Sequence, residues 1–150
     1  MGNIRESQPI AAHNAPWLIV ATREIGQKEL DKARHNPKIL QYHATTTLRA
    51  TADEVPWCSA FVNWCLREVG IAGTNSAEAR SWLHWGKVSA PMVGAIAVMH
   101  SVKGENHVAF FLEETADHFI LLGGNQHDEV RKSLYRKGQW YPLGYRWAYH

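Results

Sequence analysis

The chain has 150 residues, a length that suits one compact domain able to bury a core without the help of a disulfide or a metal ion. Hydrophobic residues make up 45% and charged residues 20% of the sequence, which excludes a disordered chain. The net charge of +2 comes from scattered Lys and Arg residues, so it does not indicate a nucleic-acid partner.

No apolar run approaches the length of a transmembrane helix, and the N-terminal residues lack the apolar stretch of a secretory signal. We therefore expect a single domain over residues 1–150 that has no membrane partner and is synthesised in the cytoplasm without a signal peptide. Residues 1–14 are expected to form a flexible or loosely packed segment.

The first half of the chain has helical patterns. Pro16 precedes an apolar helix face, and Asn36 followed by Pro37 is typical of a helix start. Asn75 and Glu78 lie at the spacing of a capping box. A loop is expected over residues 45–55. The expected helices span residues 15–30, 36–43, 56–70 and 74–86.

The second half changes to short β-branched or aromatic runs separated by Gly, Asp and Lys clusters, which is typical of strands. Helices followed by an antiparallel meander predict an α+β domain. The expected strands span residues 94–100, 106–114, 118–124, 130–135 and 145–149.

Both cysteines lie in the segment DEVPWCSAFVNWC, residues 53–65, on the helix expected from Pro56 to Gly70. Seven residues separate Cys58 from Cys65 by roughly 10 Å along a helix axis. A disulfide needs Cα atoms within about 7 Å, so the two thiols cannot pair. Cys58 lies in the first turn, where free amides and the helix dipole favour a thiolate. Cys65, two turns deeper, is expected to be a small core residue.

A thiol nucleophile needs a base, and the base needs an orienting group. Among the nine histidines, His107 begins an apolar strand, where it is rigidly held yet reachable. Asn125 lies 18 positions later, and the intervening hairpin brings it back close to His107. Each residue alone is readily explained as a strand-end polar group or a turn former. The three types together, in this order, favour a Cys-His-Asn catalytic set.

Two other interpretations stay open at this point. Cys58, His107 and His127 together have the side chains of a zinc site, although no C-x-x-C or H-x-x-x-H spacing supports one. The Trp-rich stretch 82–85 is either a platform for a glycan or, as its helical spacing favours, part of the core.

The segments PWCSAFVNWC, VGAIAVM, NHVAFFL, LGGNQ and LGYRW together resemble the CHAP-type branch of the NlpC superfamily of papain-like cysteine peptidases and amidases. The resemblance extends over residues 16–147. It implies a small papain-like fold in which N-terminal helices pack on a C-terminal antiparallel sheet and the nucleophile lies at a helix start.

The resemblance also implies roles for individual residues. Cys58 matches the nucleophile, His107 the general base and Asn125 the third polar position. Trp57 and Gln126 flank these positions and are candidate substrate-binding residues. No metal and no organic cofactor is required by this chemistry.

Members of this family typically cut amide bonds in bacterial peptidoglycan. The implied function is a cysteine-dependent N-acetylmuramoyl-L-alanine amidase or stem-peptide endopeptidase, working as a phage-type lysin or a secreted antibacterial effector. Such a protein acts in the periplasm or cell wall after non-classical delivery, and an effector has a secretion machine and a cognate immunity protein as partners. The alternatives are a thiol acyltransferase or deamidase acting on a protein or lipid, and a non-catalytic wall-binding module.

Overall fold

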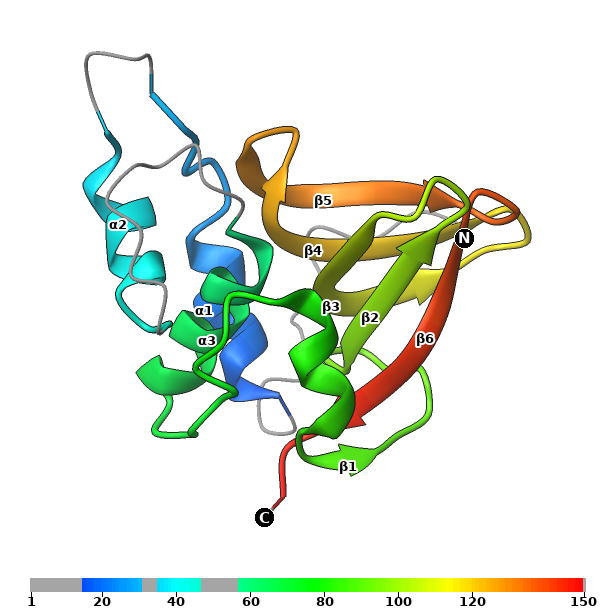
Figure 1. Ribbon diagram of the computed structural model, residues 1–150, viewed down its shortest axis with the longest axis horizontal. Coiled ribbons are helices and arrows are strands. Elements are labelled where there is room, and N and C mark those ends of the chain that lie inside the picture. The colour runs from blue at the N-terminus through cyan, green and yellow to red at the C-terminus, as the bar shows by residue number, and fades with distance from the viewer. Residues whose placement is uncertain (1–14, 31–34, 47–56, 150) are drawn as a thin grey trace.

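The computed structural model describes residues 15–30, 35–46 and 57–149 and places the helices on one side of a curved sheet (Figure 1). The expectations for residues 1–14 and for Pro56 lie outside the described residues. The α+β class predicted from the sequence is confirmed. The helices are α1 (Pro16–Arg23), α2 (Pro37–His43), α3 (Cys58–Glu68) and the 3-10 helix η1 (Ala79–His84). The strands are β1 (Lys87–Val88), β2 (Ile96–Ser101), β3 (Asn106–Glu114), β4 (His118–Gln126), β5 (Glu129–Arg136) and β6 (Trp140–Trp147).

The six strands form one antiparallel sheet in the order β1-β6-β2-β3-β4-β5. Strands β2 to β5 form the predicted meander. Strand β6 returns to pair with β2 and with the short strand β1, and β1 was not among the predicted strands. Strand β6 starts at Trp140, earlier than the predicted residue 145. Pro142 interrupts the apolar pattern of β6. It pairs with Met99 beside a register shift between Val98 and Met99, and this irregularity accommodates the missing amide hydrogen of the proline.

The first helix is shorter than predicted because the chain turns away after Arg23. Gly26 has a φ of 103°, and its amide donates a hydrogen bond to the carbonyl of Val130 at the start of β5. The amide of Val130 in turn donates to the carbonyl of Gln27. The segment between α1 and α2 therefore lies against the turn that joins β4 and β5. Asn36 caps α2 as predicted, since its side chain accepts from the amide of Lys38.

The fourth helix predicted from the sequence forms as the 3-10 helix η1. The prediction that Asn75 and Glu78 form its capping box is wrong. Asn75 has a φ of 58°, and its amide donates 2.9 Å to Oδ1 of Asn63 on α3 instead of starting a helix. Glu78 makes no capping hydrogen bond with its side chain. Trp82 is fully buried, and its indole donates to Oγ of Ser59 at 2.8 Å. The core interpretation therefore holds for Trp82.

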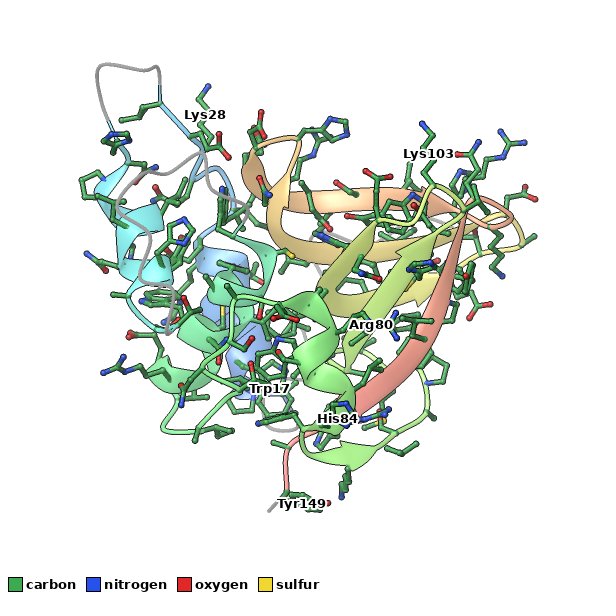
Figure 2. The ribbon with its side chains drawn as sticks, in the orientation of Figure 1. Trp17, Lys28, Arg80, His84, Lys103 and Tyr149 are labelled. Atoms are coloured by element: carbon green, nitrogen blue, oxygen red, sulfur yellow. The ribbon has the colours of Figure 1, made fainter. Side chains whose placement is uncertain are left out.

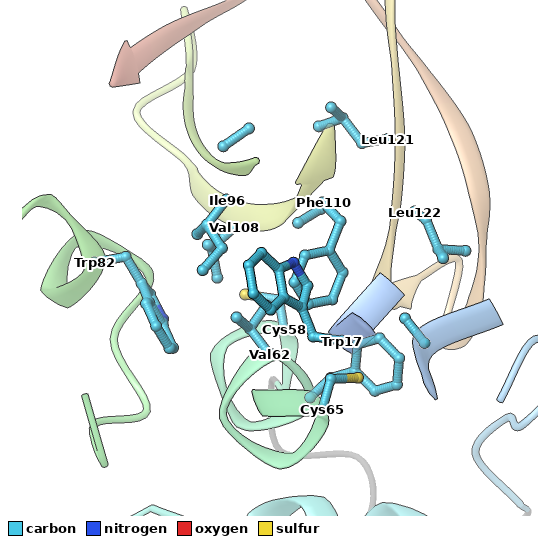
Figure 3. Close-up of a cluster of buried hydrophobic side chains, with 14 of the residues drawn as sticks. Trp17, Cys58, Val62, Cys65, Trp82, Ile96, Val108, Phe110, Leu121 and Leu122 are labelled. Carbon is cyan, nitrogen blue, oxygen red and sulfur yellow. The ribbon is translucent and has the colours of Figure 1, made fainter. Parts of the chain in front are cut away.

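The core lies between α3 and the sheet. The Phe61 and Phe110 rings meet edge to face with centroids 6.4 Å apart. Cys65 is fully buried in the same cluster as Phe110 (Figure 3). A Cβ atom on Gly124 of β4 would lie 2.6 Å from the Trp57 ring and 2.7 Å from Cβ of Phe61. The absence of a side chain at this glycine lets α3 approach the sheet closely.

The labelled basic side chains project from separate parts of the molecule. Lys28 follows α1, Arg80 lies on η1 and Lys103 lies in the turn after β2 (Figure 2). This distribution agrees with the scattered charge read from the sequence. Within the part of the chain that the structure describes, no helix is long and apolar enough to cross a membrane.

Candidate active site

Cys58 is the first residue of α3, and Trp57 is the residue before the helix. The indole of Trp57 is fully buried and donates 2.9 Å to Oε2 of Glu29. Its face packs on Gly124, as the close approach of β4 requires. Trp57 therefore has no exposed surface with which to bind a substrate, and the prediction of that role is corrected: its indole packs the start of α3 in place.

The thiol of Cys58 meets the ring of His107, the second residue of β3, and the two side chains form a hydrogen bond. The backbone amides of Val108 and Ser59 also donate to the sulfur of Cys58. Both residues of the pair are 9% exposed. The helix start and the strand start thus hold the sulfur from two sides.

The pair has the electrostatics of a thiolate facing an imidazolium. Burial alone would raise the pKa of Cys58, but the charge of His107 and the hydrogen bonds from that ring and from the two amides outweigh it, so the pKa lies below its ordinary value. Burial alone would lower the pKa of His107, but the charge of Cys58 and the hydrogen bonds with Cys58 and Gln126 outweigh it, and the pKa is raised. Each group therefore favours the charged form of the other.

The residue behind the imidazole is Gln126 and not Asn125. Oε1 of Gln126 lies 3.1 Å from Nε2 of His107. The pairing of β4 with β5 shifts register between Gly123 and Gln126, and Asn125 lies in this bulge with a φ of 58°. One extra residue in a strand turns the next side chain to the opposite face. The predicted contact of Asn125 with His107 is therefore made by its neighbour.

The amide of Gln126 is fixed in one orientation. Its Nε2 donates to the carbonyl oxygens of Arg131 and, at 3.4 Å, of Leu121. Oε1 must then face His107 and can only accept a hydrogen bond, so Nε2 of the imidazole carries the proton. The other ring nitrogen, Nδ1, is left to exchange a proton with the thiol of Cys58.

Tyr135 of β5 completes the surroundings of the imidazole and was missed by sequence reasoning. Its hydroxyl donates 2.6 Å to Oε1 of Gln126, and its ring is stacked on the His107 ring with centroids 5.5 Å apart and planes at 24°. Burial raises the pKa of Tyr135, so the hydroxyl keeps its proton. The only signal in the sequence is an aromatic residue in a strand, which does not point to a site.

The zinc interpretation finds no ligand set among residues 15–30, 35–46 and 57–149, where no three His, Cys, Asp or Glu side chains are arranged to hold one ion. His127 lies exposed in the turn after β4 with a φ of 53°.

An α+β domain that holds a buried thiol–imidazole pair at the junction of a helix start and a strand start is equipped for nucleophilic attack on a carbonyl carbon. A family model described as the CHAP domain matches residues 50–125, which is 76 of the 150 residues. The chain belongs to the CHAP domain family, as the resemblance of its motifs predicted.

CHAP domains in general are hydrolases, either amidases or peptidases, that act on peptidoglycan. The matched range includes Cys58 and His107 and ends one residue before Gln126. No curated protein and no solved structure matches the chain significantly.

Proposed function

We propose that the protein is a cysteine-dependent peptidoglycan hydrolase that cleaves an amide bond, either between the sugar and the stem peptide or within the peptide. The observation that carries the proposal is the hydrogen-bonded pair of Cys58 and His107, with the pKa of the thiol lowered and that of the imidazole raised, in a CHAP domain. Perturbed pKa values of this kind are typical of an activated nucleophile and its base.

In this mechanism the thiolate of Cys58 attacks the amide carbonyl carbon, and a carbon–sulfur bond forms as the oxygen becomes an anion. The amide of Cys58 is in the first turn of α3, where backbone N–H groups have no acceptor within the helix, and it can donate to this oxyanion. The imidazolium of His107 gives its proton to the leaving nitrogen and the carbon–nitrogen bond breaks. Water, deprotonated by His107, then hydrolyses the thioester.

The proposal assigns to Gln126 the orienting role that the sequence prediction gave to Asn125. The support is that Oε1 of Gln126 accepts from the far nitrogen of His107 while its own orientation is fixed by two backbone carbonyls. A nucleophile on a helix start facing a base on a strand is the arrangement of papain-like enzymes, and we include that fold in the proposal.

The test is hydrolysis of purified peptidoglycan by the wild type and three variants, with the products identified by mass spectrometry. Cys58→Ala and His107→Ala are expected to lose release of new amines, and Cys65→Ser, the matched change at the buried thiol of the same helix, is expected to retain it. Products with a free muramic acid carboxyl identify an amidase, and shortened stem peptides identify an endopeptidase. Amine release that survives Cys58→Ala would contradict the assignment of the nucleophile.

We further propose that this activity is exerted in the periplasm or cell wall, as expected for a lysin or a delivered effector. Expression in a bacterial host with an added export signal should lyse cells, while expression without one should not. An exported Cys58→Ala variant is the control. Lysis that does not depend on export would contradict this setting.

A further inference from the structure

Tyr135 lies on β5, far from Cys58 and His107 in sequence. Its ring nevertheless lies close to the proposed catalytic pair. It touches His107 through its face and Gln126 through its hydroxyl. We propose that Tyr135 is a positioning residue that stabilises the charged pair of Cys58 and His107. This inference rests on the proposed function, in which Cys58 is the nucleophile.

The hydroxyl acts through Gln126. With His107 and Tyr135 both donating to Oε1, and Nε2 donating to Arg131 and Leu121, every hydrogen-bonding direction of the amide has a partner. Gln126 is only 3% exposed, so water offers little competition for these partners. The hydroxyl therefore helps to keep the acceptor oxygen in line with Nε2 of the imidazole.

The ring acts directly on His107. The stacked arrangement places the negative face of the phenol against the imidazole, and such a face attracts a cation more than a neutral ring. Trp140 of β6 meets the Tyr135 ring edge to face at 5.1 Å and 87°, which restricts the phenol to this position. The interaction favours the imidazolium form.

Two further charges act on the same place. The thiolate of Cys58 raises the pKa of Tyr135 in addition to the larger effect of burial, and the cation of Arg131 on β5 lowers it. The effect of the Cys58 thiolate on the pKa of Tyr135 shows that the phenol ring lies within the field of the pair.

If Tyr135 stabilises the charged pair, its loss must change both ends of the pH range in which the pair exists. The thiolate forms only at a higher pH, and the imidazolium is lost at a lower pH, so the range narrows from both sides. A variant that merely loosens the fold reduces the amount of reactive protein at every pH and leaves the two limits in place.

The experiment measures two curves against pH. The rate of iodoacetamide labelling of Cys58, with the labelled cysteine identified by peptide mass spectrometry, gives the limit at which the thiolate forms, and an NMR titration of the His107 ring gives the limit at which the imidazolium is lost. Tyr135→Leu is expected to narrow the pH range by about one unit in total, the size of a partly buried cation–π contact expressed as a pKa change. Tyr135→Phe keeps the stacked ring and is expected to recover most of the range. Tyr135→Met, which fills a similar volume without an aromatic face, takes the place of Tyr135→Leu if the latter does not fold.

Tyr42→Phe is the matched control, because it removes a buried tyrosine hydroxyl that donates to Glu24, the residue after α1, rather than to Gln126. It should lower stability and leave both limits of the pH range unchanged. A folded Tyr135→Leu or Tyr135→Met variant with the limits of the wild type overturns the inference. The proposed function fails separately, if Cys58 of the wild type labels no faster near neutral pH than an ordinary thiol.

Discussion

The substitution Gln126→Leu separates the structural assignment of the orienting residue from the one made on sequence. Leu has about the volume of Gln and no hydrogen-bonding group. It leaves the hydroxyl of Tyr135 and the Nε2 proton of His107 without their shared acceptor, and it removes the donor to the carbonyls of Arg131 and Leu121. The matched change is Asn125→Gly, which removes the neighbouring side chain and keeps a residue that readily adopts the φ of 58°.

The expected magnitudes follow from these contacts. A hydrogen bond to a charged group contributes about 1.5–3 kcal/mol, so losing the one between Gln126 and the imidazolium should reduce kcat/KM by about 10- to 100-fold. The unpaired groups left at this buried position should lower the free energy of unfolding by about 2–4 kcal/mol. Asn125→Gly should change stability by no more than about 1 kcal/mol and leave kcat/KM within about twofold, because no hydrogen bond joins Asn125 to His107 in the described structure.

Dye release from labelled peptidoglycan gives kcat/KM, and chemical denaturation gives the free energy of unfolding. Assays at a temperature where both variants are folded keep the stability loss of Gln126→Leu out of the rate. An Asn125→Gly variant that loses more activity than Gln126→Leu would refute the reasoning, because it would mean that the bulge does not place Gln126 behind the imidazole.

Three other predictions concern the thiols and the close contact of α3 with the sheet. Cys65→Ser puts a hydroxyl into a fully buried apolar site and should lower the free energy of unfolding by about 1–2 kcal/mol while thiol chemistry persists, as a denaturation curve and an activity assay will show. Gly124→Ala places a methyl group 2.6 Å from the Trp57 ring and should cost about 1–3 kcal/mol and displace the start of α3, so both the melting temperature and activity should fall. Because the pKa of Cys58 is lowered, its contribution to the free energy of unfolding should grow as the pH rises toward the ordinary thiol pKa of about 8.5. Because the pKa of His107 is raised, its contribution should be full below the ordinary imidazole pKa of about 6.5 and be lost as the pH rises through the folded-state pKa. Cys58→Ala should remove the contribution of the pair, and a wild type with the same pH dependence as Cys58→Ala would contradict the ion pair.

The parts of the fold that the sequence predicted are those governed by local patterns. Cys58 could be placed at a helix start, and Cys65 in the core, from helix geometry alone. His107 could be placed at a strand start because an apolar run follows it directly. These predictions needed only the periodicity of one element and its boundary.

The parts that sequence reasoning missed depend on backbone detail or on contacts between distant elements. Asn125 was aligned with His107 by counting across a regular hairpin, and the bulge after Gly123 shifts that count by one residue. The run GGNQHD did contain a signal, since Gly, Asn and Asp are the residues that tolerate a positive φ. Tyr135 gave none, because its role comes entirely from the pairing of β5 with β4.

The bulge explains how one short hairpin serves two different requirements of the site. Gly124 must face α3 so that Trp57 and Phe61 can pack directly against the backbone of β4. Gln126 must face the imidazole of His107 on the other side of the pair. In a regular strand, the side chains of residues 124 and 126 point to the same face of the sheet. Gly124 could then not face α3 while Gln126 faced the imidazole. The register shift between Gly123 and Gln126 removes this conflict, which makes a straightened β4 incompatible with the site even if every side chain were kept.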